Sequence, residues 1–314
     1  MRICSFLPSA TEIVYALGLG DQLYGVTRSC DYPAAALAKP VVVRSILDEE
    51  GLSSTDIDRI VKEHARDGQS VYHIDMEALR AADPDLILTQ ELCDVCAVGY
   101  QDVLTQVKDL PKSPRVVSLN PTALEDVLHD MLTVGEVTDT SELARSTVAA
   151  LRQRIESVRQ RAAQTITRPR VFCLEWMDPL FVSGHWIPEM VEIAGGTDGI
   201  GNHGTPSSQV TWDQVRAYQP EIIILMPCGA DVSKTLSELE YVRALPGWHD
   251  LPAVRASQVY AVNASAYFSR SGPRLVDGLE LLAQIIQPAL FPWTVSQDIA
   301  IRVPGPELAQ QVPA

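Results

Sequence analysis

Basic residues are scarce in this chain. Lysine and arginine total 25 against 40 aspartates and glutamates, which gives a formal net charge of −15. Proteins that bind nucleic acids draw much of their affinity from lysine and arginine side chains that neutralise phosphates. An acidic chain of this kind is therefore not expected to bind nucleic acid.

Long hydrophobic runs are also absent. The longest, Ile222 to Met226, is far shorter than the roughly 20 residues that a transmembrane helix needs. The first residues reach Pro8 before they form the apolar region of about 7–15 residues that marks a secretory signal. We expect no membrane span and a cytoplasmic location for the sequence as it stands, or a periplasmic or extracellular one if an export leader has been removed. The six cysteines are then expected as free thiols.

Several familiar catalytic motifs are missing. The chain has no phosphate loop ending in Gly-Lys-Ser/Thr, no H-E-x-x-H and no G-x-S-x-G. Its single C-x-x-C, at Cys93 and Cys96, is a weak zinc signal because structural zinc sites normally have a second such pair or suitably spaced histidines. The sequence therefore points away from phosphate-loop, zinc-protease and esterase chemistry.

Strand, helix and strand patterns open the chain. Residues 2–7 form a short apolar run, Ser9 to Glu12 have a capping-box pattern, and the helix that follows is expected to end at Gly18. A second strand is expected over 23–27. The start of the chain thus predicts a βαβ unit in a parallel sheet.

The second half repeats this pattern. Aligning Pro84 with Pro220 superposes Asp85 on Glu221 and gives helix, proline and strand in both places. Any α/β protein has helices followed by a proline and a strand, so the alternative to a structural repeat is that both halves simply belong to the α/β class. We expect an α/β fold with two Rossmann-like lobes, each with a central parallel sheet.

The segment between the halves is helical in pattern, with no proline from 122 to 164. A connector of this kind is stiff. The expected domains are an N-terminal α/β lobe (1–121), a helical connector (122–167), a C-terminal α/β lobe (168–289) and a tail (290–314). The tail is expected to be packed in part by Phe291 and Trp293 and frayed beyond them.

Side chains with binding chemistry gather in the strand-to-helix loops, where parallel α/β sheets bind ligands. Aromatic residues make up only 6% of the chain, and their concentration in loops favours a large, flat, partly apolar ligand. The candidate binding residues are Ser9, Tyr32, Tyr72, His73, Gln90, Trp176, Phe181, His185, Trp186, Tyr267, Phe268, Arg270 and Arg274. The cysteines predicted at loop ends on the same side are Cys30, Cys93, Cys96 and Cys228.

Each candidate also has a purely structural interpretation. Trp176 and Trp186 could fold a loop onto the core, and His185 could hydrogen-bond a neighbouring carbonyl. The cysteines could pack as small apolar residues. The alternative use of His185, Cys93 and Cys96 is coordination of a metal, or catalysis by a cysteine with histidine as its base.

Several segments together resemble the cobalamin and iron-chelate substrate-binding proteins of ABC importers. They are RICSFLPSATEIVYALGLGDQLYGVTRSCDYP, DPDLILTQ, PRVVSLNPTALEDVL, LEWMDPLFVSGHWIPEMVEIAGG and RASQVYAVNASAYFSRSGPRLVDGLELLAQIIQP. The similarity runs in order through most of residues 2–289. Members of that family have two α/β lobes joined by one long rigid helix, with the ligand in the cleft between the lobes.

The resemblance implies a non-catalytic binding protein for a cobalamin-like corrinoid, for uptake or intracellular handling. It implies ligand contacts from Tyr32, the Tyr72–His73 pair, Trp176, Phe181 and the segment 267–274. An ABC permease is the protein partner that it implies. The alternatives are a siderophore or haem carrier, whose charges Arg270 and Arg274 would pair with, and a Cys/His-dependent enzyme.

Overall fold

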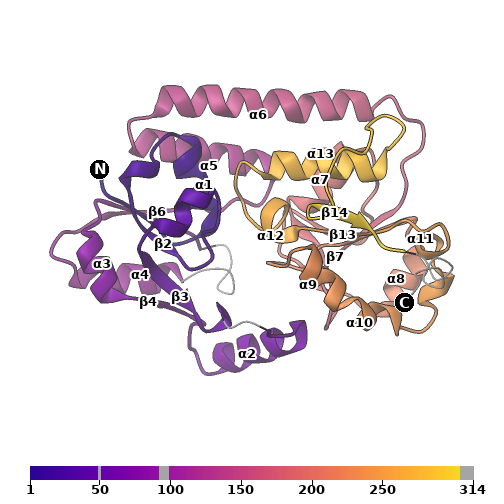
Figure 1. The fold of residues 1–314 in the computed structure, drawn as a ribbon, viewed down its shortest axis with the longest axis horizontal. Coiled ribbons are helices and arrows are strands. Elements are labelled where there is room, and N and C mark those ends of the chain that lie inside the picture. The colour runs from indigo at the N-terminus through magenta and orange to yellow at the C-terminus, as the bar shows by residue number, and fades with distance from the viewer. Residues whose placement is uncertain (49–50, 92–98, 305–314) are drawn as a thin grey trace. The chain divides into compact units, whose positions relative to one another are not determined.

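The computed structural model describes residues 1–48, 51–91 and 99–304, which form two compact units (Figure 1). The first unit contains Met1–Pro121, Glu125–Ala150 and Ser271–Pro273, and the second contains the remainder. The domain boundaries expected from the sequence remain a prediction.

The first unit has a six-stranded sheet and the helices that flank it. Its elements are β1 (Ile3–Ser5), α1 (Pro8–Ala16), β2 (Leu23–Thr27), β3 (Val41–Ser45), α2 (Ser54–Arg66), β4 (Tyr72–Ile74), α3 (Met76–Ala82), β5 (Leu86–Thr89), α4 (Tyr100–Gln106), β6 (Arg115–Ser118) and α5 (Leu124–Val137). The strand order is β4-β3-β2-β1-β5-β6, and every neighbouring pair is parallel except β3 and β4.

The second unit is built around another six-stranded sheet. Helix α6 (Ser141–Ala162) leads into it from the first unit. Its other elements are β7 (Val171–Trp176), β8 (Phe181–Val182), β9 (Gly184–His185), α7 (Ile187–Ile193), β10 (Asn202–His203), β11 (Ser208–Gln209), α8 (Trp212–Tyr218), β12 (Ile222–Leu225), α9 (Val232–Ser237), α10 (Leu239–Arg243), α11 (Pro252–Arg255), β13 (Val259–Val262), α12 (Ala264–Tyr267), α13 (Leu275–Ile286) and β14 (Ala300–Arg302). The strand order is β11-β8-β7-β12-β13-β14, with β7, β12 and β13 parallel at its centre.

Two α/β units with parallel strands at their centres confirm the predicted fold class. The halves also share atomic detail. In the first, the Arg2 backbone N–H donates to the Asp85 carboxylate at 2.8 Å, and in the second Arg170 donates in the same way to Glu221 at 3.0 Å. The alignment of Asp85 with Glu221 therefore reflects a structural repeat rather than only a common class.

Helix α1 begins two residues earlier than the sequence predicted. Pro8 occupies its first turn and Leu7 is the N-cap, with no side-chain cap. The capping box expected from Ser9 to Glu12 is therefore wrong, because proline, with its fixed φ and missing N–H, already suits the first helical position. Ser9 lies inside the helix and is buried.

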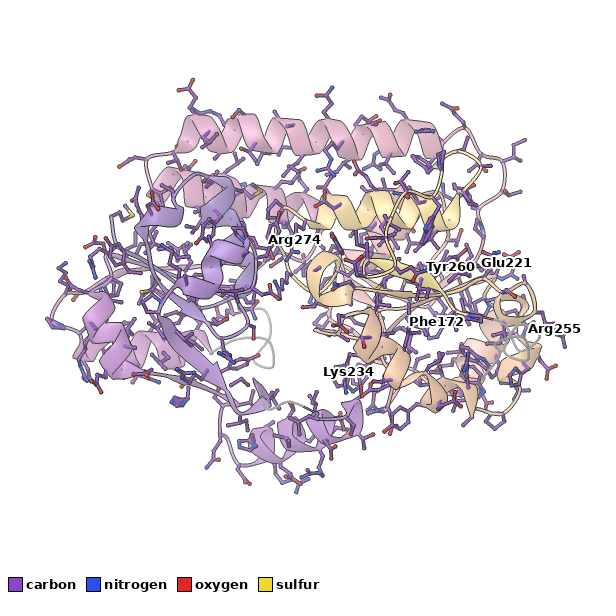
Figure 2. All side chains as sticks on the ribbon, viewed as in Figure 1. Phe172, Glu221, Lys234, Arg255, Tyr260 and Arg274 are labelled. Atoms are coloured by element: carbon purple, nitrogen blue, oxygen red, sulfur yellow. The ribbon has the colours of Figure 1, made fainter. Side chains whose placement is uncertain are left out.

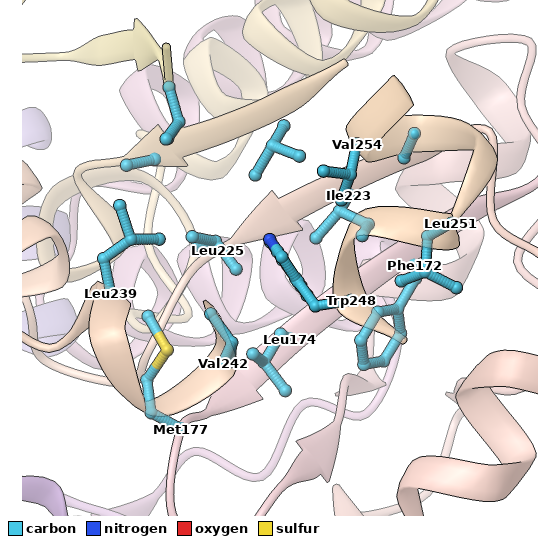
Figure 3. Packing of buried hydrophobic residues seen from close by; sticks show 14 of the residues in the cluster. Phe172, Leu174, Met177, Ile223, Leu225, Leu239, Val242, Trp248, Leu251 and Val254 are labelled. Carbon is cyan, nitrogen blue, oxygen red and sulfur yellow. The ribbon is translucent and has the colours of Figure 1, made fainter. Parts of the chain in front are cut away.

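Each unit has its own hydrophobic core. In the first, Phe6, directly after β1, and Ile87 of β5 pack with Leu79 of α3. In the second, Phe172 and Ile223 pack with Trp248, at the centre of the cluster in Figure 3. These cores hold the strands, and so they fix the positions of the loops at the strand ends.

The end of the described chain corrects a second expectation. Phe291 is buried, and Trp293 stacks on Tyr260 with the two ring centroids 6.0 Å apart. Beyond them, β14 pairs antiparallel with β13, so the chain is not frayed from Trp293 to Arg302. Among the described residues, no helix is long and apolar enough to cross a membrane.

Candidate functional site

In the first unit, the predicted residues lie at the carboxyl ends of the parallel strands. Ser9 follows β1, Tyr32 follows β2 and Gln90 follows β5. Tyr72 begins β4 and pairs with Ser45 at the carboxyl end of β3, because β4 is antiparallel. The five strand ends form one edge of the sheet, which is the edge where ligands bind in this class of fold.

These side chains differ in exposure. Tyr32 is 46% exposed, Tyr72 is half-buried against the core, and His73 points from the opposite face of β4 and is exposed. Gln90 and Ser9 are buried, and Ser9 accepts a hydrogen bond from the Ser271 hydroxyl at 3.3 Å. Tyr32 and Tyr72 are thus the aromatic groups of this edge that a ligand can contact.

In the second unit, Trp176 and Phe181 are cross-strand partners. Trp176 ends β7, Phe181 begins β8, and a bulge separates this pair from the next. Both side chains are half-buried. The indole Nε1 of Trp176 is buried without a hydrogen-bond partner among the described residues. Buried donors are normally satisfied, so a bound molecule or an ordered water is the expected acceptor.

Helix α12 brings further predicted residues to the carboxyl end of β13. The guanidinium of Arg274, labelled in Figure 2, lies 5.8 Å from the centroid of the Tyr267 ring, and Arg270 donates to the Ser265 hydroxyl at 3.1 Å. A Cβ at Gly278 would overlap the carbonyl oxygen of Tyr267. Glycine at this position therefore lets α13 approach α12 closely enough to fix Tyr267.

Trp186 and Phe268 are interior residues. They are 6% and 3% exposed, and the Trp186 indole N–H donates to the Phe268 carbonyl at 2.9 Å. Neither ring is at the surface, so the structure favours a role in positioning α12 over direct contact with a ligand. Their predicted role as ligand contacts is not tested.

His185 lies apart from the carboxyl ends of the main sheet. Its strand β9 pairs with β10, and its backbone N–H donates to Thr205 at 2.7 Å. Its φ is +53°, its ring stacks on Trp186 at 5.5 Å, and its Nε2 is buried without a hydrogen-bond partner among the described residues. Burial lowers the pKa of His185, which favours the neutral imidazole that metals bind.

The described thiols among the predicted residues lie in different local surroundings. Cys30 is buried beside the hydroxyls of Thr11 and Thr27, at 3.0 and 3.2 Å, and Cys228 follows β12 and is half-buried. Cys93 and Cys96 lie outside the described residues. Within the part of the chain that is described, no three His, Cys, Asp or Glu side chains gather as metal ligands would.

Two features near the site were not predicted. Glu12, in α1, is only 2% exposed, and its Oε2 lies 3.3 Å from where a Cβ on Gly272 would stand. The spacing of Glu12 within an apolar run could have indicated a buried carboxylate. Ser271, which donates a hydrogen bond to Ser9, could not have been predicted from the sequence, because a serine near a glycine and a proline indicates only an ordinary turn.

The family is decided by a match along most of the chain. The family model described as periplasmic binding protein matches residues 3–266. The chain belongs to the periplasmic binding protein family. A vitamin B12-binding protein of Yersinia pestis (strain Pestoides F) is 28% identical over 298 residues, which cover 94% of this chain and 89% of that protein.

Solved structures of this periplasmic binding protein class have the same fold. The periplasmic vitamin B12 binding protein of Vibrio cholerae has a TM-score of 0.67 at 24% identity, with 92% of this chain and 97% of that chain covered. A periplasmic haem-binding protein from Pseudomonas aeruginosa has a TM-score of 0.70 at 20% identity, with 94% and 95% covered.

Membership of this family confirms the resemblance found in the sequence. The comparisons place the chain in the periplasmic binding protein family, among relatives whose names give vitamin B12 or haem as the ligand. These relatives are binding proteins, so the comparisons give no support to catalysis by a cysteine with His185 as base.

Proposed function

We propose that this periplasmic binding protein relative binds a cobalamin-like corrinoid. The observation that carries the proposal is the cross-strand pair of Trp176 and Phe181 at the end of β7. A corrinoid is large and flat, with apolar faces and a polar rim, and aromatic side chains bury such faces at low entropic cost. The names of the B12-binding relatives support the same ligand.

We assign ligand contacts to Tyr32 and Tyr72 in the first unit and to Trp176, Phe181 and Tyr267 in the second. Each of these side chains is half-buried or exposed, so each offers ring surface to a ligand. The location of the ligand between two lobes, expected from the sequence, stays a prediction.

Haem or a ferric siderophore is the second candidate ligand. Arg270 and Arg274 favour it, because guanidinium groups pair with the propionates of haem and with anionic chelates. The haem-binding structural neighbours agree with this alternative.

Calorimetric titration separates the candidates. We expect cyanocobalamin and cobinamide to bind the purified protein at a ratio of one to one, and haem and a ferric siderophore to bind at least about tenfold more weakly, a difference of about 1.4 kcal/mol. Tighter binding of haem or of the siderophore would replace the corrinoid as the ligand.

We further propose that the His185 imidazole would supply a nitrogen ligand to the corrinoid cobalt, which requires the ligand to extend from the carboxyl edge of the sheet to β9. Its unpartnered Nε2 and its lowered pKa are the supporting observations. Aquocobalamin should then show shifted visible bands on binding, and His185→Ala should abolish the shift without abolishing binding. His203→Ala is the matched control, because His203 pairs in register with His185 but is exposed. A shift that persists in His185→Ala would remove this assignment.

The cellular role proposed is uptake or intracellular handling of the ligand. An ABC permease is the partner proposed for uptake, and the cytoplasmic location expected from the sequence suits handling instead. Cell fractionation with antibody detection distinguishes them, since a protein recovered with the periplasmic or extracellular fraction serves uptake.

A further inference from the structure

Helix α2 differs from the other long helices of the protein in how little of it is buried. Only Ser54 is buried among its thirteen residues, whereas nine of the twelve residues of α13 are buried. Most helices in proteins are stabilised by packing of an apolar face. A helix of this length with one buried residue is therefore unusual.

Local interactions explain why α2 forms at all. Ser53 and Asp56 make a capping box, and the ion pairs Arg59–Glu63 and Lys62–Asp58 lie one turn apart along the polar face, at 3.2 and 2.7 Å. Caps and i,i+4 pairs stabilise a helix through contacts among its own residues. They stabilise the helix without using its apolar face.

The apolar face of α2 is continuous and only half-buried. Ile57, Ile60, Val61 and His64 follow one another at helical spacing, and none of them is fully buried. The His64 ring bonds the Ile60 carbonyl at 2.9 Å, which orients the ring along the same face. We call these four residues the α2 apolar face.

Helix α2 lies in the segment between β3 and β4, which starts and ends at the sheet edge proposed to bind the ligand. β3 ends at Ser45, and the chain returns at Tyr72, the partner of Ser45 in the sheet. The two connections are fastened together, because the Ile46 N–H donates to the Val71 carbonyl at 3.0 Å and the Ser45 hydroxyl donates to it at 3.1 Å. Figure 1 shows α2 standing apart from the sheet of this unit.

We propose that the α2 apolar face covers the flat, apolar face of the bound corrinoid. The proposal rests on the proposed function. The chain leaves for α2 after Ser45 and returns from it at Tyr72, at the sheet edge that also carries Tyr32. A ligand bound at this edge therefore lies next to the residues from which α2 extends. A large macrocycle offers an apolar surface that matches a face of two isoleucines, a valine and a histidine ring.

Hydrogen exchange of the full chain with cyanocobalamin tests this without any substitution. We expect the amides of α2 to exchange about tenfold more slowly in the bound protein, and the amides of α13 to change little. Bound protein whose α2 exchange is unchanged would overturn the proposal and leave the proposed function standing. A wild-type protein that binds no cyanocobalamin in calorimetry would overturn both.

A pair of variants tests the same face by kinetics. Ile57→Ser with Val61→Ser should raise the cyanocobalamin dissociation rate about tenfold. Ala65→Ser with Arg66→Ser is the matched control, because both residues are exposed and lie outside the α2 apolar face, and the change keeps the capping box and the ion pairs of the helix, so that rate should stay nearly unchanged. Equal rates in the two variants would contradict the proposal.

A shortened chain covers the case in which the serine variants unfold α2. Residues 47–70 are replaced by Asn-Gly, because the bond from Ile46 to Val71 can flank a two-residue hairpin turn. The dissociation rate should again rise about tenfold. If the ligand-free wild type is a dimer in sedimentation and the shortened chain a monomer, the α2 apolar face binds a second copy, and our assignment is overturned.

Discussion

Replacement of Trp176 by alanine is expected to weaken corrinoid binding by about 1–3 kcal/mol, a rise of roughly 5- to 150-fold in Kd, because a buried aromatic anchor contributes that much. The melting temperature of the ligand-free protein should hardly change, since the ring is only half-buried at the end of β7. Calorimetry and a thermal melt measure the two quantities. Tyr267→Ala is expected to behave in the same way.

Two control variants make this test decisive. Trp248→Ala removes a core indole that is 4% exposed, so it should lower the melting temperature and leave the affinity of the remaining folded protein unchanged. Trp176→Phe keeps an aromatic ring but loses the unpartnered Nε1. If Trp176→Ala loses affinity and Trp176→Phe does not, the contribution of Trp176 comes from stacking of its ring on the ligand. If both variants lose the same affinity, it comes from the indole N–H. A loss of fold stability in Trp176→Ala as large as that of Trp248→Ala would place Trp176 in the core.

The elements of the fold that follow from local chemistry could be predicted from the sequence. Strand β2 begins and ends where the apolar run does. The helix-proline-strand pattern at Pro84 and Pro220 is correct because a residue before proline avoids the helical region. Asp83 and Gln219, the residues before the prolines, adopt φ of +43° and +53° and end α3 and α8 in the same way.

Elements that depend on distant partners could not be predicted. β14 contains three residues and forms only because β13 offers an edge for antiparallel pairing. β4 is equally short and is held by β3. A three-residue strand that is not part of a longer apolar run, as β1 is, has too little periodicity to stand out in a sequence. The same capping-box pattern that was wrong at Ser9 is present in the structure at Ser53 and Thr211, so the pattern alone does not decide.

The sequence could predict which sheet edge carries the candidate site, but it could not predict which aromatic side chains at that edge are exposed. Strand-to-helix loops always follow the carboxyl ends of parallel strands, so Tyr32, Gln90 and Trp176 could be placed from the strand assignments. Burial depends on tertiary packing. For that reason the sequence could not separate Trp176, which is half-buried, from Trp186, whose N–H is used by the Phe268 carbonyl.

Asp130→Asn should stabilise the ligand-free protein, and the gain should grow with pH. Burial, with a smaller contribution from the Asp126 charge one turn away on α5, raises the pKa of Asp130 from 3.8 to about 7. Its Oδ2 is buried with no hydrogen-bond partner in the described part of the chain. Above about pH 7 the folded protein must hold this carboxylate charged, which costs about 2–4 kcal/mol relative to the unfolded chain.

The sign of the pH dependence is fixed by that raised pKa. Between 3.8 and about 7 the unfolded state binds fewer protons at this group than the folded state, so the folded state loses stability as the pH rises. Asparagine has no such charge. Urea unfolding should therefore show Asp130→Asn more stable than the wild type by about 2–4 kcal/mol near pH 8 and by roughly half as much near pH 5.

Glu136→Gln is the matched control for this substitution. Glu136 is an exposed carboxyl on the same helix, so its replacement should change the free energy of unfolding by no more than about 0.5 kcal/mol at either pH. A pH-independent gain in Asp130→Asn would show that the carboxylate is already solvated in the folded protein. A loss of stability in Asp130→Asn would mean that both carboxyl oxygens of Asp130 accept hydrogen bonds in the folded protein, which an amide with one oxygen cannot do. The raised pKa of Asp130 would then have to be abandoned.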